Sequence, residues 1–377
     1  MSGRIAFVIA EDRQFAARGL PLLRAAQELR LEADVVTAVT GRAEMIERSG
    51  AGVLSVKANL ASINPMTAGY AAGQVAARLK AARPDIVHCI GLGPALIGGA
   101  ACVMAGIERR AYSLGPLGRL ALPDDHLGWL GRRAVGSLLK GPLGSGRTRL
   151  VFETVADAEL FGQGPASIVL NGFGVDTDRV RPLPMPAAPP VKIAIVAPMS
   201  WGKGIDIAVE AMRIARLHRP EIELSLFDGP EGRRSQPFAP ETLREWAHRD
   251  GIHWHEAAPR SAADIWADHH VACLPSRGGE GTPYHLVKAA ACGRPIVATD
   301  VPGCRELVTD GSEGFLVPAE DAPALAEAFV KLAADPVLLP TMGAAARARI
   351  LHGYLERDIT EAAKGLYSDM LGPGGRP

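Results

Sequence analysis

The chain has 377 residues, which is longer than one hydrophobic core usually supports, so two domains are expected. Hydrophobic residues make up 47% and charged residues 22%, a balance that is typical of folded globular proteins and argues against a disordered chain. The formal net charge is zero, which disfavours a nucleic-acid-binding protein because such a protein needs a strongly basic surface.

The cysteines and the apolar runs indicate in which cellular compartment the protein is expected. The cysteines are odd in number and scattered, and none forms a Cys-x-x-Cys pair: Cys89, Cys102, Cys273, Cys292 and Cys304. They are interpreted as reduced core residues of a cytosolic protein rather than as a disulfide framework or the ligands of a structural metal. The apolar run Ile5–Ala10 is too short for a signal peptide, and no run reaches the roughly 20 residues that cross a bilayer.

The first half alternates short apolar runs with helical patterns, which predicts a parallel sheet covered by helices on both faces. Strands are expected at Ile5–Ala10, Ala33–Thr37, Gly52–Val56, Asp85–Cys89 and Leu150–Glu153. Apolar residues recur at helical spacing over three further segments, Leu20–Leu31, Thr67–Ala82 and Ala95–Ala105. His88 at the end of a strand is expected to be a satisfied structural histidine rather than an acid or base.

A locally basic stretch runs from residue 109 to residue 149. It interleaves leucines with cationic and aromatic residues, of which Arg119, Trp129, Arg132, Arg133 and Lys140 are candidates for an acceptor-binding or membrane surface. Such a mixture can lie on an anionic membrane, where each nearby Lys or Arg adds about 1 kcal/mol. An ordinary, partly solvated helix pair is the alternative.

The Pro-rich run RPLPMPAAPP interrupts the pattern near residue 183 and suits a semi-rigid connector. We expect a domain at 1–183, a linker at 184–190, a second domain at 191–355, and a helix and tail at 356–377 that could return to the first domain. After the linker, strands are expected at KIAIVAP and at Ile222–Phe227, Ile252–Trp254, Val271–Leu274, Pro295–Thr299 and Phe315–Val317. Helices are expected at Ile205–Leu217, Pro323–Ala334 and Leu338–Leu351.

Two doubly wound α/β domains place their ligands at the carboxyl ends of the strands, so the domains are expected to face each other across a cleft. The most informative stretch there is Leu274–Val317, LPSRGGEGTPYHLVKAAACGRPIVATDVPGCRELVTDGSEGFLV. A glycine-rich loop, Ser276–Pro283, lies between a strand and a helix, and its amides together with the positive helix end suit a diphosphate. A solvated, glycine-rich connector is the alternative.

This stretch resembles the donor-site signature of family 4 of the retaining glycosyltransferases, which have the GT-B fold. The signature is a Glu-Gly-x-Pro loop, a helix, an Ala-Cys-Gly turn and a Gly-x-x-Glu loop. The resemblance points to the bacterial O-antigen, capsule or lipid-linked oligosaccharide type. Further similar segments are RGLPLLRAAQELRLEADVVT, RPDIVHCIGLGPALIGGAA, NGFGVDTDRVRPLP and WGKGIDIAVEAM.

The resemblance implies roles for individual residues. It implies that Glu280 contacts the donor sugar as the catalytic residue and that Lys203, beside Gly202, contacts the diphosphate. The amides of Gly281 and Thr282 would lie near the phosphates. Asp300 and Gly303 would shape the following loop, and Glu306 would close it, either as a ligand contact or as a helix cap.

The chain departs from the family pattern at four places. Lys288 stands where relatives have a ribose-binding Glu, and an ammonium cannot accept hydrogen bonds as a carboxylate does. Ala197–Met199 lacks an Arg that relatives use, so Lys288 could supply the missing cation. The first-domain loop that begins YSLGPLGRL lacks the usual His or Glu, and Arg277–Gly279 holds one extra residue.

The sequence therefore predicts a metal-independent hexosyltransferase that moves a sugar, with retention, from a nucleoside diphosphate sugar to a polyprenyl-linked or glycan acceptor. It is expected to need no cofactor, to bind no nucleic acid, and to act in cell-surface polysaccharide synthesis at the cytoplasmic face of the inner membrane. A non-catalytic GT-B partner or scaffold protein is the alternative. A sugar-nucleotide epimerase of the same fold is less favoured, because the transferase resemblance extends over a longer stretch.

Overall fold

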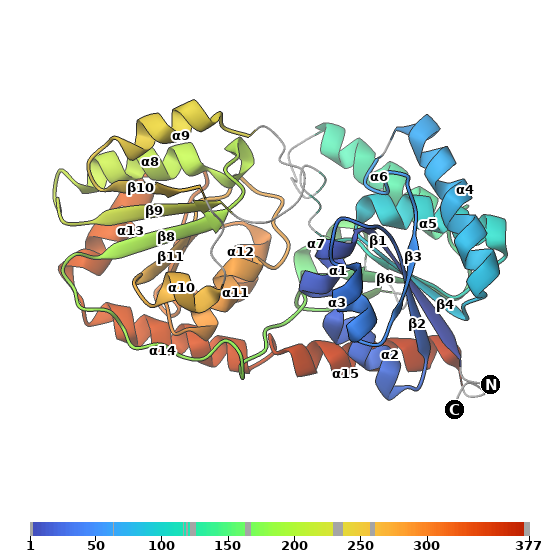
Figure 1. The fold of residues 1–377 in the computed structure, drawn as a ribbon. Helices are drawn as coiled ribbons and strands as arrows, with labels where there is room; N and C mark the ends of the chain where they lie inside the picture. Colours follow the sequence, from blue (N-terminus) through green and yellow to red (C-terminus); the bar gives the residue numbers. More distant parts are fainter. Residues whose placement is uncertain are drawn as a thin grey trace. The chain divides into compact units, whose positions relative to one another are not determined.

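The computed structural model describes residues 3–62, 64–115, 117, 120, 126–162, 167–228, 237–256 and 261–372, and of Ala17 the backbone only. The chain divides into two compact units (Figure 1). The first unit combines Met1–Gly174 with Glu356–Pro377, and the second is Val175–Leu355. Among the described residues, no helix is both long and apolar enough to cross a membrane.

The first unit is built on a parallel sheet in the order β3-β2-β1-β4-β5-β6-β7. Its strands are β1 Arg4–Glu11, β2 Glu32–Ala38, β3 Gly52–Ser55, β4 Ile86–Ile90, β5 Arg110–Ser113, β6 Thr148–Phe152 and β7 Ser167–Val169. The chain winds outward from β1 to one edge and then returns to build the other. This order of strands is that of a doubly wound sheet.

Side chains of β1 alternate between two separate cores, because successive residues of a strand point to opposite faces of the sheet. Ile5 and Phe7 pack with α1 Asp12–Arg18, α2 Leu20–Glu28, α3 Ala43–Arg48 and α15 Glu356–Leu371. Ala6 and Val8 pack with α4 Pro65–Ala82, α5 Leu92–Ala105, α6 His126–Lys140 and α7 Val155–Leu160. Burial on both faces explains why the strand sequence is almost continuously apolar.

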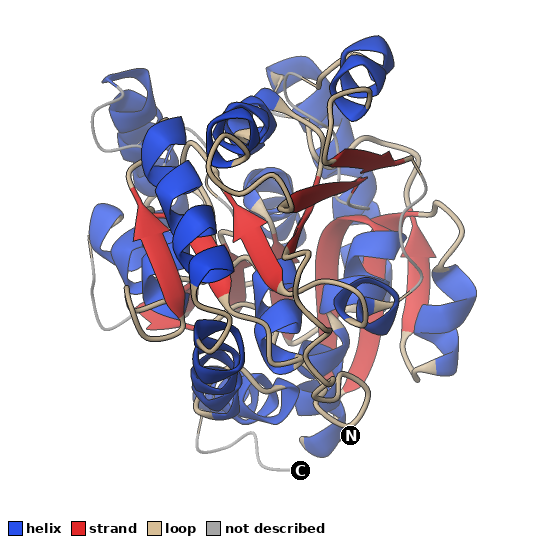
Figure 2. Cartoon of the chain, turned by 90° about the vertical axis from the view of Figure 1, so that its left-hand side faces the viewer, coloured by secondary structure: helices blue, strands red, loops and turns tan. Residues whose placement is uncertain are grey.

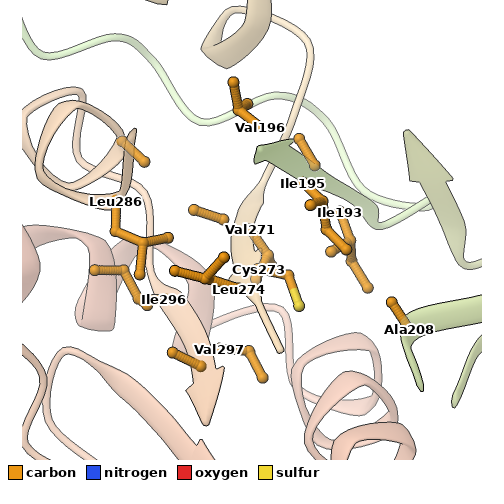
Figure 3. Packing of buried hydrophobic residues seen from close by; sticks show 14 of the residues in the cluster. Ile193, Ile195, Val196, Ala208, Val271, Cys273, Leu274, Leu286, Ile296 and Val297 are labelled. Atoms are coloured by element: carbon orange, nitrogen blue, oxygen red, sulfur yellow. The ribbon is translucent and has the colours of Figure 1, made fainter. Parts of the chain in front are cut away.

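The second unit repeats this architecture with a parallel sheet in the order β10-β9-β8-β11-β12-β13. Its strands are β8 Lys192–Ala197, β9 Glu223–Asp228, β10 Ile252–His255, β11 Val271–Leu274, β12 Ile296–Thr299 and β13 Gly314–Val317. Figure 2, with this unit toward the reader, shows helices on both sides of the strands. Side chains of β8, β11 and β12 belong to its core, and Ile193, Cys273 and Val297, labelled in Figure 3, lie on the same face of the sheet.

The helices of the second unit cover both faces of its sheet. After the short 3-10 helix η2 Trp201–Lys203 come α8 Ile205–Ala215, α9 Pro240–Ala247, α10 Ala262–Trp266, α11 Tyr284–Ala291, α12 Pro302–Leu307, α13 Ala322–Ala334 and α14 Leu338–Leu351. Helix α8 packs with α13, whereas α11 packs with α10 and α14. The expected α/β fold with two Rossmann-like, doubly wound sheets is thus confirmed.

Short elements escaped the sequence analysis. It did not predict β5 and β7, because Arg-Ala-Tyr-Ser and Ser-Ile-Val are too short to show a period. Helices α9 and α10 were also missed. Both are of eight residues or fewer, below the length at which an amphipathic pattern becomes recognisable.

The chain divides after Gly174, ahead of the boundary expected at residue 183, because the segment that follows packs on the second unit. The amide of Val175 donates to the carbonyl of Tyr354 over 2.8 Å. The wholly buried guanidinium of Arg294 donates to the carbonyls of Leu183 over 3.0 Å and Pro184 over 2.7 Å. The Pro-rich run therefore begins as part of the second unit, and the helix and tail at 356–377 group with the first.

A buried carboxylate ties the end of β1 to the loop after β2. Asp12 is fully buried and accepts hydrogen bonds from the amides of Arg13, Thr40, Gly41 and Arg42, at 2.7–3.1 Å, and from the Thr40 hydroxyl. Burial alone would raise the pKa of Asp12, but the hydrogen bonds from Thr40, Arg42 and Arg13 outweigh it and lower the pKa. Asp12 therefore stabilises the first unit in its ionised form.

We expect Asp12→Asn to lower the free energy of unfolding of the first unit by about 1.5–3 kcal/mol at pH 7, the usual contribution of hydrogen bonds to a charged group. Because the folded pKa is lowered, this contribution is fully present above the unfolded value of about 3.9 and is lost as pH falls below it through the folded pKa. Urea unfolding of wild type and variant at pH 7 and pH 3 should therefore show a gap that narrows in acid. A gap of the same size at both pH values would contradict this role.

Candidate functional site

Two loops meet at the carboxyl edge of the second sheet. Strands β8 and β11 are hydrogen-bonded neighbours in parallel register, so the loops that follow them leave the sheet side by side. The loop after β8 carries η2 with Lys203, and the loop after β11 carries Ser276 and Glu280. The sequence-predicted donor residues therefore come from two segments far apart in the chain.

Lys203 and Glu280 form an ion pair between these loops. The Lys203 Nζ atom lies 2.7 Å from Glu280 Oε1 and 2.8 Å from Oε2, so the ammonium donates to both oxygens. The hydroxyl of the wholly buried Ser276 donates to Oε1 over 2.6 Å. Glu280 itself is 8% exposed. Burying a carboxylate is costly unless it is paired and hydrogen-bonded, and here it has an ammonium and a hydroxyl as partners.

Close backbone approach explains two of the glycines around this pair. Gly204 has φ +66°, and a Cβ there would lie 1.9 Å from the carbonyl oxygen of Pro275. A Cβ on Gly303 would lie 2.0 Å from the carbonyl oxygen of Gly281. Only glycine lets three loops of the carboxyl edge pack this tightly. Gly303 thus shapes the predicted donor loop, Ser276–Pro283, through the backbone of Gly281.

The donor loop leads into α11. Gly281 is buried and Thr282 partly buried, directly before Pro283 and the first turn of the helix. Lys288 lies one turn further along, partly buried, with Nζ 4.3 Å from the centroid of the Tyr284 ring. This is a cation–π geometry between residues four apart on one helix face.

Two neighbouring residues differ from what the sequence suggested. Met199 lies wholly within the hydrophobic core, so an Arg introduced there would bury a charge. Glu306 lies near the end of α12 and Val301 is the N-cap, so a capping role for Glu306 at that N-terminus is wrong. The exposed Asp300 accepts a hydrogen bond from Arg305 Nε over 2.6 Å and belongs to the same loop.

His88 in the first unit is fully buried. Its Nδ1 lies 2.8 Å from the hydroxyl of Tyr367 and its Nε2 lies 2.7 Å from the hydroxyl of Ser113. Burial lowers the pKa of His88 to about 3, so the ring is neutral near pH 7. These contacts are those of a satisfied structural histidine.

Four of the five candidate acceptor or membrane residues line one cavity of about 460 Å³ between α6 and the end of α7. Lys140 Nζ donates to the carbonyl of Phe161 over 2.6 Å, and the mostly buried Arg132 donates to the carbonyl of Leu120. The Arg133 guanidinium lies 5.0 Å from the centroid of the Trp129 ring. Arg119, the fifth candidate, lies outside the described residues.

Sequence reasoning assigned no role to Ser276 and Arg277, although both belong to the site. Ser276 fixes Glu280, and Arg277 contacts the loop of Lys203 through its backbone and its side chain. The only signal was the extra residue in Arg277–Gly279, which predicted an altered loop but not its contacts. Within the described residues, no three His, Cys, Asp or Glu side chains are grouped to hold a metal ion.

Part of the chain is similar to known proteins. Residues 190–335 match the family described as Glycosyl transferases group 1. A D-inositol 3-phosphate glycosyltransferase of Kribbella flavida is 30% identical over 204 residues, 50% of this chain and 47% of that protein. A putative colanic acid biosynthesis glycosyltransferase, WcaL, of Escherichia coli is 32% identical over 203 residues, 51% of this chain and 48% of that protein. The matched part of the chain thus spans about half the length of these curated relatives.

Solved structures resemble the whole chain. Anabaena Alr3699/HepE in complex with UDP and glucose has a TM-score of 0.75 at 17% identity, covering 97% of this chain and 100% of that chain. A sucrose-phosphate synthase of Thermosynechococcus elongatus has a TM-score of 0.75 at 16% identity, covering 98% and 99%. Both comparisons show the fold alone. The family resemblance expected from the motifs is confirmed: the chain has the GT-B fold, and its residues 190–335 carry the sequence of the group 1 glycosyl transferases.

Proposed function

We propose that the protein is a glycosyltransferase that takes a sugar, with retention of configuration, from a nucleoside diphosphate sugar bound by its second unit. The observation that carries this proposal is the Lys203–Glu280 pair held by Ser276 at the carboxyl edge of β8 and β11. The group 1 match covers this edge. The Anabaena protein, which shares the fold, was crystallised with UDP-glucose.

In the proposed reaction, the donor separates the pair and each partner takes a group of the substrate. The ammonium of Lys203 turns to the diphosphate, where negative charge develops as the glycosidic bond breaks. The carboxylate of Glu280, still held by Ser276, accepts hydrogen bonds from hydroxyls of the sugar. The amides of Gly281 and Thr282 and the positive end of α11 add to the field that stabilises the leaving group.

The acceptor proposed for the first unit is a lipid-linked or polysaccharide sugar of cell-surface glycan synthesis. Similar proteins include a putative colanic acid biosynthesis glycosyltransferase and a phosphatidyl-myo-inositol mannosyltransferase, and these names support a glycan or lipid acceptor. We also propose peripheral binding at the cytoplasmic face of the inner membrane. Helix α6 supports binding to a membrane surface, because it exposes Leu127 at 68% and Leu130 at 56% beside Arg133.

A non-catalytic scaffold of the same fold remains the competing function, and Lys288 is the residue that favours it. The Lys203–Glu280–Ser276 arrangement favours the transferase, because a scaffold has no need to bury a carboxylate against an ammonium in a ligand loop. Turnover of a nucleotide sugar separates the two functions.

Glu280→Gln tests the catalytic role. The amide keeps the volume of the side chain but loses the charge that Lys203 and the sugar hydroxyls recognise, so we expect transfer to fall at least about 100-fold. Glu313→Gln is the matched control, because Glu313 is equally buried at 9% but precedes β13, at the amino edge of the sheet. Transfer rates and melting temperatures are measured together. Undiminished turnover by Glu280→Gln would remove Glu280 from the site.

Arg133→Gln combined with Leu130→Gln tests membrane binding. Arg132 and Lys140 are avoided because both donate to backbone carbonyls, so their loss would disturb the fold. We expect the double variant to sediment with anionic vesicles at least roughly fivefold less than wild type, since the lost charge alone accounts for that factor. High salt should decrease sedimentation of the wild type similarly. Arg48→Gln, an exposed Arg of α3 on the opposite face of the sheet, is the control. Equal binding of wild type to neutral and anionic vesicles would contradict the proposal.

Lys288→Glu tests whether Lys288 serves the diphosphate. A carboxylate near the phosphates is repulsive, so we expect nucleoside diphosphates to bind at least about tenfold more weakly by calorimetry, although the change restores the family residue. Lys331→Glu is the control, because Lys331 lies 5.8 Å from the centroid of the Phe315 ring in a comparable contact on α13. Tighter binding by Lys288→Glu would show that Lys288 opposes donor binding.

A further inference from the structure

Arg277, in the lengthened part of the donor loop, makes several side-chain contacts at the carboxyl edge. Its Nη1 atom lies 2.8 Å from Asp206 Oδ1 and its Nη2 atom lies 2.7 Å from Asp206 Oδ2. This is a bidentate pair with the first turn of α8, the helix that directly follows Lys203 and Gly204. The Arg277 side chain is 11% exposed and that of Asp206 is 31% exposed, so solvent screens the pair only in part.

Arg277 also donates hydrogen bonds to the loop that carries Lys203 and to Glu320. The Nε atom donates to Glu320 over 2.8 Å, and Nη1 donates to the carbonyl of Trp201. The guanidinium lies 4.0 Å from the centroid of the Trp201 ring, and the backbone amide of Arg277 donates to the carbonyl of Gly202 over 3.0 Å. The short helix η2 is therefore held by Arg277 at two carbonyls and one ring.

Glu320 keeps its contact with Arg277 at a conformational cost. Its φ is +62°, in the left-handed region, where a residue with a Cβ is disfavoured and glycine or asparagine is usual. The side chain of Glu320 reaches Arg277, whereas glycine has no side chain and that of asparagine is shorter. Two acidic residues therefore contact one guanidinium, Asp206 from the first turn of α8 and Glu320 from the turn between β13 and α13.

These contacts lie next to the Lys203–Glu280 pair. Ser276 precedes Arg277 and holds Glu280, while Arg277 holds the residues on both sides of Lys203, at Trp201, Gly202 and Asp206. These four side-chain hydrogen bonds of Arg277 all end on protein oxygens, so its charge is satisfied within the site and is not the cation that a diphosphate would meet.

We propose that Arg277 is a positioning residue that clamps the Lys203 loop to the Glu280 loop, so that ammonium and carboxylate stand ready for the diphosphate and the sugar of the donor. The clamp rests on the proposed function, since it assigns Arg277 a part in donor binding through Lys203. Lysine cannot replace it, because one ammonium cannot bond Asp206 in bidentate fashion, reach Glu320 and stack on Trp201 together.

The test is a double-mutant cycle of Arg277→Met and Lys203→Met, with binding of UDP, GDP, ADP and CDP measured by calorimetry in the full chain. We expect Arg277→Met to weaken binding of the nucleotide with the highest affinity at least about tenfold. Arg277→Lys should recover only part of that affinity. In the Lys203→Met background, Arg277→Met should weaken binding little further. Arg213→Met is the control, because it removes an exposed Arg213–Glu210 pair from the same helix α8. A purely structural role would instead give additive losses that follow the melting temperature.

Hydrogen exchange without nucleotide provides a second readout. Arg277→Met should speed exchange of the amides at 201–204 relative to Arg213→Met, while the amides of β8 and β11 keep their wild-type rates. If none of the four nucleotides binds the wild type, the proposed function fails and the assigned part in donor binding fails with it. If the wild type binds a nucleotide and Arg277→Met binds it equally well, only the clamp is overturned.

Discussion

The Lys203–Glu280 ion pair is the interaction on which the candidate site depends. Two opposite charges are expensive to bury unless each is paired and hydrogen-bonded, and here the carboxylate has the ammonium on both oxygens and the Ser276 hydroxyl on one. The ammonium and the carboxylate are in direct contact with each other, and in our proposal a bound ligand separates them and pairs with each. A diphosphate beside a sugar offers both at once, which is why this arrangement suits a nucleotide sugar.

The fold brings the pair together through parallel strands and backbone contacts that only glycine permits. Neighbouring strands β8 and β11, buried on both faces, bring their loops out at one edge, and α8 begins directly after Gly204 at that edge. Gly204 and Gly303 then let the three loops approach to distances that any Cβ would forbid. The strands cannot shift register without exposing apolar side chains, so the positions at which the loops begin are fixed. The large core of the second unit thus supports a small polar site.

The sequence predicted much of the fold and the identity of the central pair, but not the residues that position it. Alternating apolar and helical patterns identify most strands, and the motif around Glu280 identifies the donor loop through its family resemblance. The roles of Ser276 and Arg277 depend on contacts with Glu280, Asp206 and Glu320, and nothing in the sequence says which acid a given Arg will reach. The same holds for Arg294, whose bonds to the carbonyls at 183 and 184 bring the start of the Pro-rich run into the second unit.

The central claim is that the second unit binds a nucleotide sugar through the separated Lys203–Glu280 pair. Saturation-transfer NMR with a panel of nucleotide sugars measures this most directly, on wild type and on Lys203→Met. The account predicts that at least one donor receives saturation on both its sugar and its nucleotide protons from the wild type and loses it with Lys203→Met. Equal saturation from both proteins, or none from the wild type with any donor, would contradict it.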